Sequence, residues 1–287
     1  AMLELVLGFA VLVLVTLLSI VQGHLQSIED ARSSAISIAR TALLVLLAAS
    51  WLGIPAQAQN TLPANKVFRF VPHANLAVLD PIWTTAYVTR NHGYMIYDTL
   101  FGTDLSGKVK PQMVDKWTVS KDNLTWTFKL RDGLEFHDGK AVTSEDVAAS
   151  LKRWSTRDTM GGVLFAFVDK LETPDANTFR MVLKEPCAIV LEALGKASSN
   201  VPFIMPARIA ATPGTEQIKE HIGSGPFIFK PDEFKPGSVA VYERNTKYVS
   251  RSEAPNGLAG ARPVNFDRVE WVIIRDPQTQ FNAIVAG

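Results

Sequence analysis

The sequence contains a single cysteine, Cys187, among its 287 residues. One cysteine excludes an internal disulfide and excludes any metal site built from several thiolates of this chain. A lone thiol usually packs as a small apolar side chain, and we expect Cys187 to be buried in this way. The cysteine content therefore predicts no redox or metal chemistry.

An excess of charge of one sign is also missing. The chain has 29 basic and 28 acidic residues, which give a formal net charge of +1 at pH 7. No run of Lys and Arg approaches the density of a phosphate-binding stripe, so we expect no nucleic-acid partner. With 47% hydrophobic residues, the chain is long enough for one large or two ordinary folded domains.

Patterns typical of catalysis or metal binding are absent as well. No two histidines lie three or four residues apart, and none has a cysteine beside it, so no zinc motif is present. The glycines around Ser224 have the wrong spacing for a nucleophile elbow. We therefore expect no catalytic residue, no metal and no cofactor, and a binding protein rather than an enzyme.

One near-match to a nucleotide-binding loop needs a separate test. Residues 102–109 almost fit the phosphate-binding pattern G-x-x-x-x-G-K-[ST], but Val109 occupies the position of the required hydroxyl. Asp104 would place a negative charge where phosphate sits, and Pro111 would block the helix that should follow. We expect a polar hairpin loop here instead.

Long hydrophobic runs occur near the start of the chain. A basic, Ser-rich stretch precedes the apolar run 41–49, and small residues follow at Ala56 and Ala58. This is the layout of a secretory signal peptide, which we place at residues 25–58 with cleavage after Ala58. We expect a periplasmic protein, and the lack of a cysteine near the cut argues against a lipid anchor.

Residues 1–24 hold a second apolar segment, Leu5 to Val21, of uncertain status. Its length approaches the roughly 20 residues of a membrane-spanning helix, so one interpretation is a membrane anchor. The other is upstream sequence joined by a wrongly chosen start. We favour the second, because a signal peptide normally begins its chain.

Beyond residue 65 the pattern alternates between strands and helices, which indicates an α/β fold. The firmest local prediction is a helix from about Ser144 to Trp154, because Thr143 and Asp146 form a capping box before an apolar face. Other expected helices cover residues 87–101, 188–194 and 279–286. Expected strands cover residues 67–71, 117–119, 124–130, 168–172, 178–183, 226–229, 239–243 and 269–274, including two hairpins.

Several short motifs occur together and in a fixed order. They are Leu79-Asp80-Pro81, Tyr97-Asp98-Thr99-Leu100-Phe101, Trp126 to Gly133, Phe136 to Val147, Ile222 to Phe227, and Arg244-Asn245-Thr246-Lys247-Tyr248. In combination they resemble the family-5 solute-binding proteins, the receptors of ABC importers for oligopeptides, dipeptides and nickel. The similarity covers nearly all of residues 65–287.

The resemblance implies a periplasmic-binding-protein type II fold. Lobe I would be discontinuous, built from residues 65–101 and 206–287, and a small α/β domain II would cover residues 102–205. The family pattern continues past the equivalent of Gly287 into a second lobe. We therefore expect this chain to be C-terminally truncated, with the second lobe missing, and to bind weakly for that reason.

The resemblance also implies where a ligand would bind. In peptide-binding members, a segment just after the Leu-Asp-Pro turn pairs with the ligand main chain as an added strand. Aligned without gaps, this segment is Thr85, Ala86 and Tyr87, and Met160, Gly161 and Gly162 would approach the same cleft from the small domain.

The expected function is capture of a peptide or similar small solute and its delivery to an ABC permease of the inner membrane, by a protein that we expect to be a monomer. Two alternatives remain open. One is a nickel- or haem-type receptor on the same fold, and the other is a membrane-tethered sensor anchored through Leu5 to Val21.

Overall fold

The computed structural model describes residues 66–286. The predicted apolar segment 1–24 and the predicted signal peptide 25–58 lie outside the described residues, and both remain predictions. Within residues 66–286, the helices are too short or too polar for any of them to span a bilayer.

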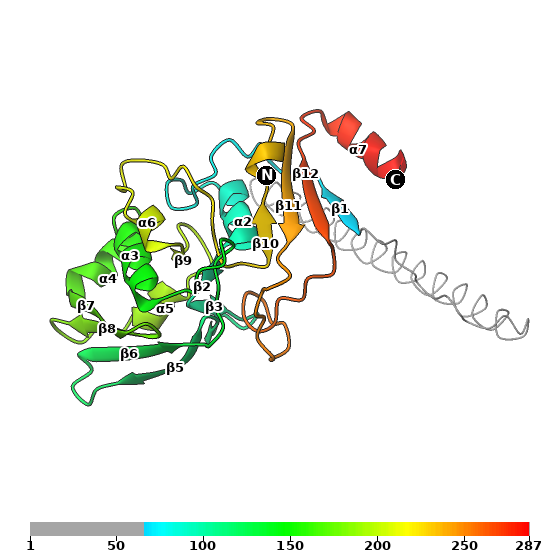
Figure 1. Ribbon diagram of the computed structural model, residues 1–287. Coiled ribbons are helices and arrows are strands. Elements are labelled where there is room, and N and C mark those ends of the chain that lie inside the picture. Colours follow the sequence, from blue (N-terminus) through cyan, green and yellow to red (C-terminus); the bar gives the residue numbers. More distant parts are fainter. Residues whose placement is uncertain (1–65, 287) are drawn as a thin grey trace, which may run out of the picture. The chain divides into compact units, whose positions relative to one another are not determined.

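The first of the two larger sheets joins the beginning and the end of the described chain (Figure 1). Its order is β1-β12-β11-β10, with β1 parallel to β12 and the other neighbours antiparallel. The strands are β1 (Val67–Phe70), β10 (Phe227–Phe229), β11 (Val239–Arg244) and β12 (Arg268–Val272). Helix α2 (Tyr87–Ile96) lies beside β10. All four strands match expected ones within two residues at each end.

The second large sheet comes from one continuous stretch of sequence. Its order is β5-β6-β8-β7 and every neighbour is antiparallel. The strands are β5 (Val114–Val119), β6 (Thr125–Leu130), β7 (Val168–Asp175) and β8 (Thr178–Leu183). Both expected hairpins are confirmed, because β5 pairs with β6 and β7 pairs with β8.

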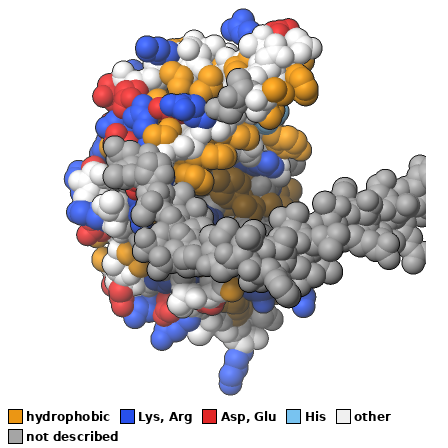
Figure 2. Space-filling view, turned by 90° about the vertical axis from the view of Figure 1, so that its right-hand side faces the viewer, with side chains coloured by type: hydrophobic (Ala, Val, Ile, Leu, Met, Phe, Trp, Pro, Cys, Tyr) orange, Lys and Arg blue, Asp and Glu red, His pale blue; other side chains and the backbone are white. Residues whose placement is uncertain are grey.

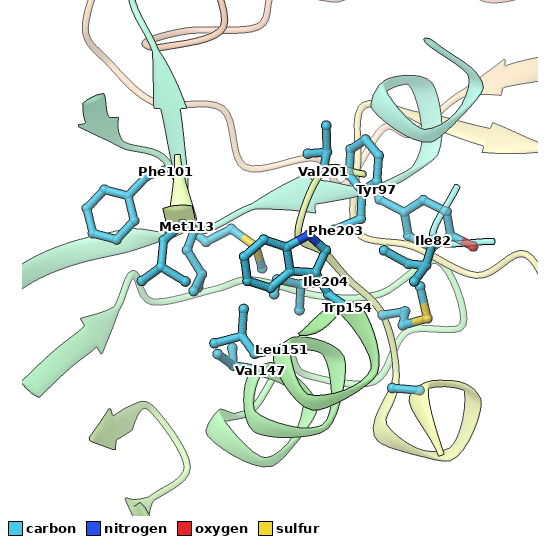
Figure 3. Packing of buried hydrophobic residues seen from close by; sticks show 14 of the residues in the cluster. Ile82, Tyr97, Phe101, Met113, Val147, Leu151, Trp154, Val201, Phe203 and Ile204 are labelled. Carbon is cyan, nitrogen blue, oxygen red and sulfur yellow. The ribbon is translucent and has the colours of Figure 1, made fainter. Parts of the chain in front are cut away.

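Helix α3 (Ser144–Ser155) covers this second sheet, and its capping box is present as expected. The Thr143 side chain accepts the Asp146 N–H, and the Asp146 carboxylate accepts the Thr143 N–H at 2.8 Å. The apolar face of α3 carries Val147, Leu151 and Trp154, which are fully buried. Figure 3 shows these three side chains beside Phe203 and Ile204 in the core.

Shorter elements complete the described chain. They are the helices α4 (Thr159–Phe167), α5 (Val190–Leu194), α6 (Ala207–Ala210) and α7 (Pro277–Ala286), the 3-10 turn η1 (Pro231–Glu233), and the strands β2 (Asp98–Thr99), β3 (Phe101–Thr103), β4 (Val109–Pro111) and β9 (Phe203–Ile204). The expected helices at 188–194 and 279–286 correspond to α5 and α7. Helix α4 was not expected.

The helix expected over residues 87–101 was too long. Helix α2 ends at Ile96, and Asp98 and Phe101 lie in the short strands β2 and β3. The error has a physical cause: Tyr97 and Leu100 are fully buried, and a short buried strand shows the same apolar run as a buried helix.

The near-match to a nucleotide-binding loop is the hairpin turn between β3 and β4, as expected. The Asp104 carboxylate accepts the backbone N–H groups of Ser106 and Lys108, both at 2.9 Å. Gly107 has a φ of 81°, which glycine adopts without strain. Asp104 therefore stabilises the turn from inside.

Candidate ligand-binding site

The turn after β1 is anchored by a buried ion pair. Asp80 accepts two hydrogen bonds from the Arg153 guanidinium of α3, at 3.2 and 2.7 Å, and both side chains are almost completely buried. Asp80 also accepts the backbone N–H groups of Ile82, Trp83 and Ile218. Five donors on one carboxylate fix the start of the segment that leads to α2.

Asn200 holds the same segment from its inner side. Its side-chain amide donates to the carbonyl oxygens of Ile82 at 3.0 Å and Thr84 at 2.8 Å, and lies 3.4 Å from that of Pro81. The Asn200 carbonyl accepts the indole N–H of Trp154 at 2.7 Å. The inward carbonyl groups of residues 81–84 are therefore occupied.

The next three residues present an open backbone edge. Thr85, Ala86 and Tyr87 are exposed, and Ala86 has an extended conformation with φ of −62° and ψ of 126°. Within residues 66–286, neither the N–H nor the C=O of Thr85 has a hydrogen-bond partner. The Ala86 carbonyl, by contrast, accepts the Arg90 N–H in the first turn of α2. In the described part of the chain, Thr85 thus keeps one donor and one acceptor without a partner, next to the extended residue Ala86.

Asp158 organises the opposite side of the site. Its carboxylate caps α4 by accepting the Gly161 N–H at 2.8 Å. It also accepts the Asn200 N–H at 2.9 Å and the Lys196 ammonium at 2.5 Å. Gly161 is buried, and a Cβ there would lie 3.1 Å from the Trp154 ring, so this glycine permits close packing.

These two sides enclose a pocket of about 420 Å³. Its lining residues are Thr85, Arg157, Asp158, Thr159, Met160, Val163, Ile189, Lys196, Ser199 and Asn200. The structure thus brings together Thr85 and Met160, one from each segment that the resemblance singled out. Ala86, Tyr87, Gly161 and Gly162 do not line the pocket, although Ala86, Gly161 and Gly162 are each adjacent in sequence to a residue that does.

The sequence did not identify most of the lining residues. Asp158 followed by Thr159 and an apolar run is a helix-start signal that could have located α4 and this wall. Lys196, Ser199 and Asn200 lie in an irregular stretch without periodicity, and nothing in the pattern indicates their position.

A buried histidine cluster lies away from this pocket, between α2 and the first sheet. His92 Nδ1 lies 2.8 Å from the Tyr242 hydroxyl, and the His92 ring contacts Phe229. Burial, together with the nearby His221, lowers the pKa of His92 to about 3, so the ring is neutral at physiological pH. Within residues 66–286, no three His, Cys, Asp or Glu side chains converge on a possible metal site.

The family model for bacterial extracellular solute-binding proteins, family 5 Middle, matches residues 108–287. A probable peptide ABC transporter periplasmic-binding protein of Sinorhizobium fredii is 43% identical over 246 residues, which cover 84% of this chain and 46% of that protein. The chain therefore spans about half the length of this relative.

Solved structures show the same fold. The dipeptide-binding protein from Pseudoalteromonas sp. SM9913 in complex with Met-Leu has a TM-score of 0.62 at 18% identity, with 77% of this chain and 46% of that chain covered. NikZ from Campylobacter jejuni in complex with Ni(L-His) has a TM-score of 0.59 at 19% identity, with 78% and 42% covered.

These likenesses confirm the expected periplasmic-binding-protein type II fold, of which this chain covers a part. How the chain divides into lobe I and domain II stays a prediction. Because the matching model spans most of the described sequence, the chain belongs to the bacterial extracellular solute-binding proteins of family 5.

Proposed function

We propose that the protein is the solute receptor of an ABC importer and captures peptides outside the cytoplasm. The observation that carries this proposal is the backbone of Thr85, which lines the 420 Å³ pocket and has no hydrogen-bond partner for its N–H or C=O within residues 66–286. A peptide main chain can pair with such an edge without regard to its side chains. This gives broad acceptance of peptides, with selectivity left to the pocket.

The described contacts support a division of roles within the site. Thr85, with Ala86 and Tyr87 beside it, pairs with the ligand main chain. Met160 supplies an apolar wall from α4, while Gly161, with Gly162 beside it, lets the first turn of α4 pack closely against Trp154. The relative named for peptide transport and the structure holding Met-Leu are consistent with a peptide ligand. The partners are then a short peptide and an inner-membrane permease, and no catalytic step is required.

The localisation follows the same proposal. A signal peptide at residues 25–58, cut after Ala58, would deliver a monomeric receptor to the periplasm. N-terminal sequencing of the protein from the periplasmic fraction tests this, with Gln59 as the expected first residue. A mature protein that begins near Leu5 and fractionates with membranes would instead favour the tethered sensor.

Binding is tested on the protein expressed from its own gene and purified from the periplasm. We expect titration calorimetry with di- to pentapeptides of mixed sequence to detect binding, and Thr85→Pro, which removes the free N–H, to weaken it at least tenfold. Thr118→Ala, on the exposed part of β5, serves as the surface control variant and should leave binding unchanged.

The nickel- or haem-type alternative is tested in the same assay. If Ni²⁺ with L-histidine, or haem, gives a binding signal and the peptides give none, the peptide proposal is wrong and the alternative replaces it. Binding of peptides that neither compound displaces supports the peptide proposal.

A further inference from the structure

The pocket beside Thr85 contains acidic and basic side chains, but only basic ones are available to a ligand. Asp158 is the one carboxylate among the lining residues. Its oxygens are occupied by Gly161, Lys196 and Asn200, and its side chain is 2% exposed. A ligand ammonium group would therefore find no free carboxylate among the lining residues.

Two arginines flank the open backbone edge without acidic partners. Within residues 66–286, neither Arg90 nor Arg157 lies in an ion pair. Most other arginines of this part of the chain contact an Asp or Glu. Arg157 lines the pocket itself, and Arg90 donates to the Ser198 hydroxyl, next to the lining residue Ser199.

Both arginines are held in place by aromatic rings. The Arg157 guanidinium lies 4.6 Å from the centre of the Trp83 ring and donates to the Trp83 carbonyl at 2.8 Å. The Arg90 guanidinium lies 4.5 Å from the centre of the Tyr87 ring. A cation over an aromatic ring keeps its full charge, so these contacts orient both guanidinium groups without neutralising them. Arg90 also donates to the Asn91 side-chain oxygen at 3.2 and 3.0 Å, which leaves Arg157 as the better placed of the two to bind an anion.

We infer that the pocket binds a carboxylate of the ligand and that Arg157 is the residue that receives it. Arg90 adds positive charge nearby, whereas the Lys196 ammonium is paired with Asp158 and adds no net charge. The apolar wall of Met160, Val163 and Ile189 then contacts the carbon chain that carries the carboxylate. This inference rests on the proposed function, and it adds a preference for peptides that present a free carboxylate at this site.

The carboxylate has two possible sources, the C-terminus of the peptide or an acidic side chain. Three peptides separate them: Ala-Glu-Ala, Ala-Gln-Ala, and Ala-Gln-Ala with an amidated C-terminus. If a side chain is the source, replacing Glu by Gln weakens binding about tenfold, the effect of losing a charge-assisted hydrogen bond. If the C-terminus is the source, amidation has this effect instead.

Arg157→Gln is the decisive variant, measured by calorimetry on the protein from its own gene. We expect the peptide that carries the recognised carboxylate to bind this variant about tenfold more weakly. Its higher affinity relative to the peptide that lacks this carboxylate should then disappear. Arg157→Lys should restore part of the advantage, because it keeps the charge and loses the planar donor geometry. Arg180→Gln, an exposed arginine of β8, is the matched control and should change nothing.

The outcomes separate the inference from the proposed function. Equal affinities for all three peptides, unchanged by Arg157→Gln, would overturn the carboxylate site while leaving peptide capture intact. Absence of binding by all of the peptides would overturn the proposed function and this inference together.

Discussion

The two large sheets of this protein differ in how completely they are covered. In the β5–β8 sheet, Phe128 and Phe179 are fully buried and stack on each other, with Leu151 of α3 in the same core. In the other sheet, every residue of β1 is exposed. The nearby helix α7 exposes Phe281 by 62% and Ile284 by 77%. Figure 2 shows hydrophobic side chains gathered on the face of the molecule where α7 lies.

This difference indicates which region of the described chain contributes more to its stability. A side chain contributes to stability in proportion to the apolar area that folding removes from water. In the core around α3, folding removes nearly all of the apolar side-chain area from water. In β1 and α7, folding removes little of it. Substitutions of similar size should therefore have large effects in the first region and small effects in the second.

The largest effect should come from the ion pair that fastens the site-bearing segment to α3. Arg153→Met leaves Asp80 buried without its counter-charge, which should lower the free energy of unfolding by about 3–5 kcal/mol. The double variant Arg153→Met with Asp80→Asn should recover part of the loss, because no buried charge remains. Urea denaturation measures both, and a single-variant loss below about 1 kcal/mol would show that the pair does not anchor the segment.

A cavity in the covered core should have the next largest effect. Leu151→Ala removes a fully buried side chain and should lower the free energy of unfolding by about 2–5 kcal/mol. The same urea titration applies, with an unchanged slope as evidence that the unfolding reaction is the same. If Leu151→Ala lowered the free energy of unfolding no more than the matched variant Ile284→Ala, the two regions would not differ in their contribution to stability.

The less covered region still has one buried group that responds to pH. The folded pKa of His92, about 3, lies below its ordinary value of 6.5. Between these values the unfolded chain binds more protons, so stability is complete above pH 6.5 and falls as the pH decreases toward 3. His92 alone should remove about 3 kcal/mol between pH 7 and pH 4.

His92→Gln tests this dependence, because it removes the titrating ring. The variant should show a shallower loss of stability between pH 6.5 and pH 4 than the unchanged protein. Burial also lowers the pKa values of His137 and His221, so some loss should persist. Identical pH profiles of the two proteins would mean that His92 does not remain neutral and buried.

The smallest effect should occur on α7. Ile284→Ala changes a side chain that is 77% exposed and should alter the free energy of unfolding by less than about 0.5 kcal/mol. A loss above about 2 kcal/mol would show that α7 is covered in solution, and it would remove the contrast between the two regions.

Much of the fold could be predicted from the sequence, because local signals agreed with the tertiary structure. The alternation around Trp126 and Phe128 predicted a strand, and the capping box at Thr143 predicted the start of α3, each close to its observed position. Prediction failed after Ile96, where a continuous apolar run hides the change from helix to short buried strands.

The candidate site was less accessible to sequence reasoning. Thr85 and Met160 were singled out from the resemblance, and the structure places both at one pocket. The sequence could not indicate Asn200, which reaches back over a hundred residues to the carbonyl groups of Ile82 and Thr84. A long-range contact made by one side chain leaves no periodic trace.

The occupied inner edge of residues 81–84 also bears on solubility. An exposed run of unpaired backbone groups can serve as a template on which other chains add strands and aggregate. Here Asn200 takes up the inward carbonyls, and α2 begins at Tyr87. Within residues 84–86, Thr85 is the residue whose N–H and C=O both lack a partner in the described part of the chain. An opening of one residue can pair with a short extended peptide but is too short to start an intermolecular sheet.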